Sequence, residues 1–171
     1  IEMSNLVDFN KLGAMLPKSI TFNPKEGNPP RRIMETPSGM LNAVGIQNKG
    51  IHHFLQHEIH EFEKFTSPLI ISISGYSREE FIEMVKLLDA REGVDGIELN
   101  ISCPNLAVGG ESFGMDPVAT YDILRAVRRY TDKAIIAKLT PNVGDITLIA
   151  KAAQEGGADS VSLINTVTAM A

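Results

Sequence analysis

The sequence alternates short apolar runs with amphipathic segments, and this alternation constrains the fold more than any other feature. Four runs rich in Ile, Leu or Val are typical of strands covered on both faces: 69–74, 96–102, 134–140 and 160–165. A weaker candidate, 14–20, is interrupted by Pro17. Alternation of this kind predicts right-handed βαβ units and a parallel sheet. A barrel and an open doubly wound sheet both fit the pattern.

Helices are expected between these runs because capping residues mark their ends. The start and stop signals are the Ser77–Glu80 capping box, the Asp116-Pro117 pair, Asp145, and the Gly156-Gly157 pair. In the helix after Asp116 the spacing predicts a buried stripe of Val118, Tyr121, Leu124 and Val127. A further helix is marked by Ile51, Leu55, Ile59 and Phe62. The long Gly- and Pro-containing segment 22–50 is expected to pass over the carboxyl ends of the strands.

Composition narrows the class of protein. With 171 residues, 43% hydrophobic and 22% charged, we expect one domain over residues 1–171. A net charge of −5 lacks the excess of positive charge that is typical of proteins that bind nucleic acid. No apolar run approaches the length of a membrane span. One cysteine, Cys103, excludes an internal disulfide and a four-cysteine zinc site. We expect a cytoplasmic protein. Because Ile1 is not an initiator methionine, we also expect the sequence to be a fragment or a trimmed chain.

Uncharged amides and two lysines collect where the predicted strands end. They are Lys18, Asn42, Asn100, Asn105, Lys138, Asn142 and Asn165. Ligands bind at the carboxyl ends of parallel strands in barrels and in open sheets. An asparagine amide both donates and accepts, so several can bind a planar ring that bears N–H and C=O groups. Cys103 lies among them, and two interpretations stay open: a thiol base, or a small buried apolar residue.

Three histidines, His53, His57 and His60, fall at a helical spacing that suits a metal face. Glutamates interleave with them, and no cysteine lies nearby. A solvated helix face is the favoured interpretation, and no metal site is predicted.

Three segments resemble a known family. They are GMLNAVGIQN at 39–48, ELNISCPN at 98–105 and SLINT at 162–166. Their sequences resemble those of dihydroorotate dehydrogenase, and most closely those of the class 1B catalytic subunit. The resemblance runs in order along nearly the whole chain. It implies a (β/α)8 TIM barrel with FMN at its C-terminal mouth, of which this chain covers about strands 2 to 6.

The resemblance also implies an activity. Members oxidise dihydroorotate to orotate in pyrimidine synthesis, as oxidoreductases acting on a CH–CH bond. In this branch the catalytic subunit is a homodimer joined to a partner subunit that carries FAD and a 2Fe–2S cluster, with NAD+ as final acceptor. Two alternatives stay open: a related FMN-dependent dihydropyrimidine dehydrogenase, and a barrel fragment without catalysis.

Residue roles follow from matching the family's motifs. Cys103 matches the base that removes the C5 proton while hydride leaves C6 for the flavin. The positions matching substrate contacts are Lys18, Asn42, Ala43, Val44, Gly45, Ile46, Asn100, Asn105, Asn165 and Thr166. Those matching flavin contacts are Lys18, Ser19, Ser72, Asn100, Lys138 and Ile164. Ser19 and Ser72 depart from the family's usual Gly and Asn, so their effect on ligand geometry is an open question.

Overall fold

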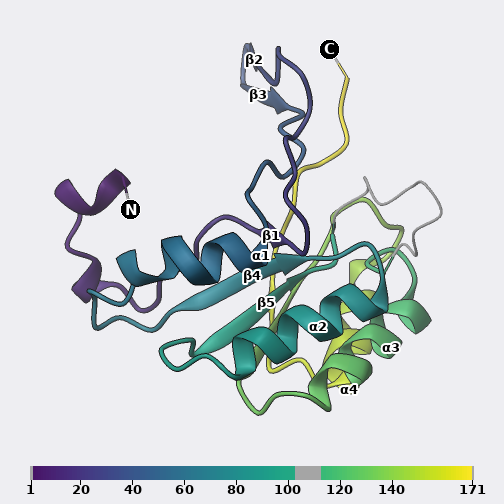
Figure 1. The fold of residues 1–171 in the computed structure, drawn as a ribbon. Helices are drawn as coiled ribbons and strands as arrows, with labels where there is room; N and C mark the ends of the chain where they lie inside the picture. The colour runs from purple at the N-terminus through teal and green to yellow at the C-terminus, as the bar shows by residue number, and fades with distance from the viewer. Residues whose placement is uncertain (1, 103–112, 171) are drawn as a thin grey trace.

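A five-stranded parallel sheet forms the centre of the computed structural model, which describes residues 2–102 and 113–170 (Figure 1). Its strands, in spatial order, are β1 (Ile20–Thr21), β4 (Ile70–Ser74), β5 (Gly96–Asn100), β6 (Ala134–Lys138) and β7 (Ser160–Ser162). Within this sheet each strand pairs in parallel with the sheet's next strand in chain order. A doubly wound sheet reverses its strand order at a switch point. Among the described strands the order never reverses, and this progression is that of a barrel.

The four strong strand predictions are confirmed, and the weak one is partly wrong. The chain at 14–20 forms only one parallel bridge, Met15 with Leu69, before β1 begins at Ile20. Pro17 has no N–H to donate, so a continuous ladder cannot run through it. Beyond β6 and β7, Leu139 donates to the Ser162 carbonyl at 3.0 Å and Asn165 to the Leu139 carbonyl at 3.1 Å. Backbone pairing therefore continues as far as Asn165, the limit that the sequence indicates.

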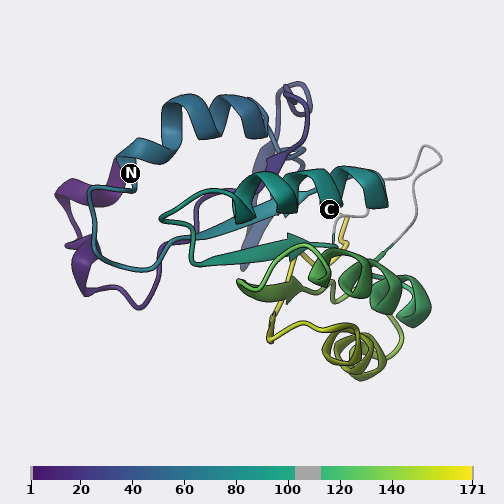
Figure 2. The same ribbon diagram turned by 60° about the horizontal axis from the view of Figure 1, so that its bottom comes forward.

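Three helices follow three of the strands and cover the sheet (Figure 2). They are α2 (Arg78–Asp89), α3 (Pro117–Arg128) and α4 (Ile146–Gly156). The predicted caps are present: Ser77 Oγ, Asp116 Oδ1 and Asp145 Oδ1 accept from backbone N–H groups in the first turns. Gly157 ends α4 in the left-handed conformation, with φ of 107°.

The predicted buried stripe of α3 is half wrong. Val118 is 68% exposed and Tyr121 is 38% exposed, whereas Thr120 is buried beside Leu124 and Val127. Thr120 satisfies its hydroxyl by donating to the Phe113 carbonyl at 2.5 Å. A prediction that counts only hydrophobic residues cannot include a buried threonine. It therefore placed the buried face of α3 on a neighbouring row of the same helix.

The helix expected from Ile51 onward is continuous but irregular. It begins as α1 (Ile51–His53), widens to a π turn in η3 (Phe54–Glu58) and tightens to a 3-10 turn in η4 (Ile59–Glu61). Two short 3-10 turns, η1 (Glu2–Asn5) and η2 (Phe9–Lys11), precede the sheet. No helix in the described part of the chain is long and apolar enough to cross a membrane.

Segment 22–50 forms a hairpin of β2 (Ile33–Thr36) and β3 (Gly39–Asn42). In Figure 1 it stands away from the sheet beside the last residues of the chain. Its return limb, 42–48, comes back to the ends of the strands, because Asn48 contacts Thr21 of β1. The expected passage over this end of the sheet is confirmed.

Alternation along the strands gives the sheet two different faces. Ile71, Ile73, Ile97 and Leu99 are fully buried in the apolar core that the helices cover. Ser72, Glu98 and Asn100 alternate with them and form the opposite, polar face. Polar side chains on this face lead directly to the carboxyl ends of the strands.

Candidate active site

A cleft of about 580 Å³ opens at the carboxyl ends of the strands. Most of the residues singled out from the sequence line it: Lys18, Ser19, Asn42, Ala43, Val44, Gly45, Ile46, Asn100, Lys138, Asn165 and Thr166. Segments from both halves of the described chain therefore meet in one place.

Each wall of the cleft comes from a different connection. Lys18 and Ser19 directly precede β1, and the 42–46 segment begins at Asn42, the last residue of β3. Asn100 and Lys138 are the last residues of β5 and β6, and they are register partners across the two strands. Asn165 and Thr166 follow β7. The strand-end rule thus explains why Asn100, Lys138 and Asn165 meet, whereas Lys18 and Ser19 reach the cleft from the segment before β1.

Two of the predicted site residues that the structure describes do not line the cleft. Ser72 is buried beneath the cleft on β4, and Ile164 is not among the lining residues. Cys103 and Asn105 lie outside the described residues.

The 42–48 segment has a constrained backbone. Gly45 has φ of 78° and Ile46 has φ of 52°, which is rare for a β-branched residue. A side chain at Gly45 would lie 3.0 Å from the Asn28 backbone nitrogen. Strained backbone persists where its surroundings hold it, and it is common at ligand sites.

Asn48 holds this segment against β1. Its Nδ2 donates to the Ile46 carbonyl and to Thr21 Oγ1, each at 2.8 Å. Its Oδ1 accepts from the Gly50 N–H at 2.8 Å. Asn48 stands in the GMLNAVGIQN motif, but its role could not be predicted from the motif because its partner Thr21 is remote in the sequence.

A polar network forms the floor of the cleft, and its centre is Glu98. This glutamate is 3% exposed and accepts from Ser72 Oγ at 2.8 Å and from Ser162 Oγ at 2.7 Å. Ser19 Oγ lies 2.8 Å from Ser72 Oγ and accepts from Asn100 Nδ2 at 3.0 Å. Glu98 is a site residue that was not predicted from the sequence, although a lone charged residue inside an apolar strand was a usable signal.

The network continues to the opposite wall. Ser102 Oγ donates to Asn100 Oδ1 at 2.6 Å and accepts from Asn165 Nδ2 at 2.9 Å. Asn165 Oδ1 in turn accepts from the Thr166 N–H at 2.8 Å. Asn142 secures the next residues, since it donates to the Thr166 carbonyl and accepts from the Thr168 N–H. Asn100 and Asn165 are therefore both held by side-chain hydrogen bonds.

A second cleft, of about 630 Å³, lies between the 24–26 and 47–49 segments and the helical segment that begins at Ile51. Lys18 is the one predicted site residue among its lining residues. His53 also borders it, with Nδ1 3.1 Å from Glu58 Oε1. The cleft at the strand ends is the better candidate, because the polar groups of four strands converge on it.

A family model for dihydroorotate dehydrogenase matches residues 1–171, the whole chain. The chain belongs to the dihydroorotate dehydrogenase family. The resemblance noted from the three motifs is therefore confirmed. The family's fold is a TIM barrel, and the chain-order parallel sheet described above is a part of that barrel.

Curated relatives agree with this placement. A protein of Thermoanaerobacter pseudethanolicus is 52% identical over 170 residues, which cover 99% of this chain and 56% of the relative. Proteins of Citrifermentans bemidjiense and Bacteroides thetaiotaomicron are 46% and 44% identical, with the same coverage. All three are named "Dihydroorotate dehydrogenase B (NAD(+)), catalytic subunit". The chain thus spans about 56% of the length of these relatives.

Proposed function

We propose that the full-length protein oxidises dihydroorotate to orotate in pyrimidine synthesis, with FMN as its cofactor. The observation that carries the proposal is the cleft at the strand ends. There the matched residues of the 42–46 segment, Asn100, Lys138 and Asn165 converge in a chain of this family.

The residues of the cleft fit the ring of a flavin. Lys18 and Lys138 bring positive charge, which stabilises an electron-rich reduced ring. Ser19 and Asn100 add hydrogen-bonding groups beside them. When bound, FMN supplies a hydride acceptor. Ser72, beneath Ser19, would act on the flavin through that hydroxyl, since it is 1% exposed.

The same cleft suits a small planar substrate with alternating N–H and C=O groups. Asn42, Asn165 and Thr166 present side chains that donate and accept, and the backbone at Gly45 and Ile46 lines the same space. We assign these groups to the amides and carboxylate of dihydroorotate. Ala43 and Val44 complete this wall.

Cys103 is our candidate for the base, with Asn105 as a substrate contact, on the strength of the ELNISCPN motif. In the proposed step the C5 proton passes to the Cys103 sulfur. The C6 hydrogen leaves with its electron pair as hydride, and a C5=C6 double bond forms. A thiolate is a far weaker base than an alkoxide, so it forms at neutral pH, where serine would stay protonated.

The names of the relatives extend the proposal to partners. "Catalytic subunit" and "NAD(+)" support a second subunit that passes electrons to NAD+. We assign FAD and a 2Fe–2S cluster to that subunit, a homodimer to this one, and a cytoplasmic location to both.

The experiment uses protein expressed from the intact gene. A flavin spectrum is recorded without oxygen, before and after dihydroorotate is added. Bleaching of a yellow protein is expected, and Cys103→Ser should keep its flavin yet bleach orders of magnitude more slowly at neutral pH. Bleaching by dihydrouracil but not by dihydroorotate would favour a dihydropyrimidine dehydrogenase. A protein that stays colourless with added FMN would overturn the proposal.

A further inference from the structure

Glu98 is a charged side chain that the proposed chemistry leaves without a role. It lies in the middle of β5, is 3% exposed, and has a hydroxyl partner at each oxygen. Ser72 of β4 donates to Oε1 at 2.8 Å, and Ser162 of β7 donates to Oε2 at 2.7 Å. A carboxylate only accepts, so each serine must point its single hydroxyl hydrogen at Glu98.

This requirement sets the direction of every hydrogen bond that follows. Since Ser72 has used its hydrogen, Ser19 must be the donor in their 2.8 Å contact. Ser19 can then only accept from Asn100, which places Asn100 Nδ2 toward Ser19 and Oδ1 toward Ser102. Ser102 donates to that oxygen and therefore accepts from Asn165 Nδ2. The donor and acceptor of every hydrogen bond from Glu98 to Asn165 are therefore fixed.

We propose that Glu98 is a positioning residue, which fixes the carboxamide orientation of Asn100 and Asn165 in the cleft. This inference rests on the proposed function. Each Nδ2 group has two hydrogens and uses one in a hydrogen bond to the described residues, so the other is available to an acceptor oxygen or nitrogen of a bound ring. The orientation thus selects ligands that present carbonyl or carboxylate acceptors at these two places.

Reversing the orientation would be costly at Glu98 itself. If Asn100 flipped, its Oδ1 would face Ser19 and take the Ser19 hydrogen. Ser72 could then donate to Ser19, which leaves Glu98 Oε1 without that donor in a buried position, or it could keep its bond to Glu98, which leaves two hydroxyl oxygens 2.8 Å apart with no hydrogen between them. A buried carboxylate oxygen without a partner suffers its full desolvation penalty, so the flip is disfavoured.

The first test is Glu98→Gln in the full-length protein loaded with FMN. Glutamine keeps the shape but both donates and accepts, so one of the two serines must reverse and the order is no longer fixed. The dissociation constant of orotate, measured by calorimetry, should rise about tenfold. Bound FMN and the thermal midpoint should show whether the fold is retained.

A matched pair of serines separates positioning from packing. Ser72→Ala and Ser162→Ala each remove one hydroxyl from Glu98, but only Ser72 lies on the route to Asn100. Ser72→Ala should weaken orotate binding as Glu98→Gln does, whereas Ser162→Ala should change it by less than about twofold. In the Ser72→Ala background Glu98→Gln should have no further effect, and in the Ser162→Ala background its effect should be retained in full.

Several outcomes would overturn the inference. One is orotate binding by Ser72→Ala that equals that of the wild type, because this variant removes the hydroxyl through which Glu98 acts on Ser19 and Asn100. Another is an equal effect of Glu98→Gln in both serine backgrounds, which is the result that a purely structural role predicts. If Glu98→Gln fails to fold, equal orotate affinities of the two serine variants would decide against it. Wild-type protein that binds FMN but not orotate would overturn the proposed function instead, and the inference with it.

Discussion

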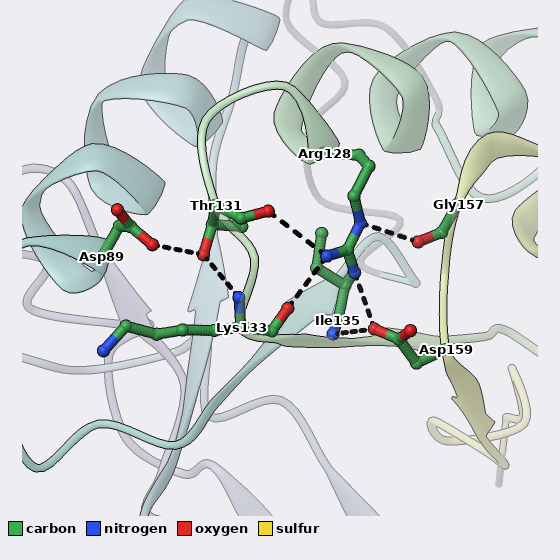
Figure 3. A network of polar contacts seen from close by, with 7 residues as sticks. All are labelled: Asp89, Arg128, Thr131, Lys133, Ile135, Gly157 and Asp159. Atoms are coloured by element: carbon green, nitrogen blue, oxygen red, sulfur yellow. Dashed lines mark hydrogen bonds and ion pairs between the residues drawn. The ribbon is translucent and has the colours of Figure 1, made fainter.

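Arg128 and Asp159 form an ion pair in which Nη2 and Oδ2 are 2.6 Å apart (Figure 3). The same carboxylate oxygen accepts from the Ile135 N–H at 2.7 Å. The guanidinium also donates to the carbonyls of Gly157 and Lys133, each at 3.0 Å. One side chain therefore ties the end of α3 to the beginning of β6 and to the turn that leads into β7. This joint lies at the amino ends of the strands, opposite the cleft, where residues serve stability.

Arg128→Lys should destabilise the protein, although it keeps the charge and most of the alkyl chain. An ammonium group cannot make the planar set of bonds that the guanidinium makes to separate acceptors. With Arg128 at 23% exposure, we expect a loss of about 1–3 kcal/mol in the free energy of unfolding. Urea unfolding measures it, and Arg125→Lys on the exposed face of α3 is the control. Equal midpoints for the two variants would contradict this assignment.

Gly114→Ala should disturb the end of β5. A methyl group at Gly114 would overlap the carbonyl oxygen of Ile101 and lie 3.0 Å from its carbonyl carbon. Because backbone must move to admit it, we expect a loss of about 1–3 kcal/mol. Orotate binding should also weaken, since Ser102, which links Asn100 to Asn165, follows Ile101 directly.

Gly144→Ala is the matched control for this change. A methyl group at Gly144 meets nothing within 4 Å. Its effect on the free energy of unfolding should stay within about 0.5 kcal/mol. Denaturant titration of both variants makes the comparison, and a neutral Gly114→Ala would show that the Ile101 carbonyl moves freely.

The sequence was sufficient to predict what local patterns determine. Apolar runs and caps located four strands and the helices between them, because both signals lie within a few neighbouring residues. The strand-end rule then correctly predicted that Asn100, Lys138 and Asn165 lie at one cleft. The choice between barrel and open sheet needed the strand order, which no local pattern contains. The family resemblance supplied that choice, and the observed order agrees with it.

What the sequence could not supply were interactions between remote residues. The role of Glu98 depends on its hydrogen bonds with Ser72 and Ser162, which are 26 and 64 positions away in the sequence. The role of Asn48 likewise depends on its hydrogen bond with Thr21, which is 27 positions away in the sequence. The buried row of α3 likewise depends on α4, since Gly156 approaches Tyr121 and Leu124 closely. Each of these features is a contact between elements, and residue type alone does not encode its partner.

Asp145 should make the stability of α4 depend on pH. Its Oδ1 accepts from Thr147 Oγ1 at 2.6 Å and from the Thr147 N–H at 2.9 Å. The side-chain hydrogen bond from Thr147, followed by the backbone one, lowers the pKa of Asp145 from its ordinary value. A carboxyl whose pKa is lowered by folding stabilises the protein fully above the pKa of the unfolded chain, about 3.9. That stabilisation is lost as the pH falls through the lower pKa of the folded state.

Asp145→Asn tests this dependence, because asparagine can cap the helix without a charge. Thermal midpoints of wild type and variant should differ at pH 7, and the gap should close as the pH falls below about 4. Thr147→Val removes the main cause of the lowered pKa but leaves the Thr147 N–H. In that background Asp145→Asn should therefore give a smaller gap at pH 7. A gap of constant size from pH 7 down to pH 2.5, about 1.5 units below the ordinary Asp pKa, would rule out the linkage, since the carboxyl would then contribute equally in both ionisation states.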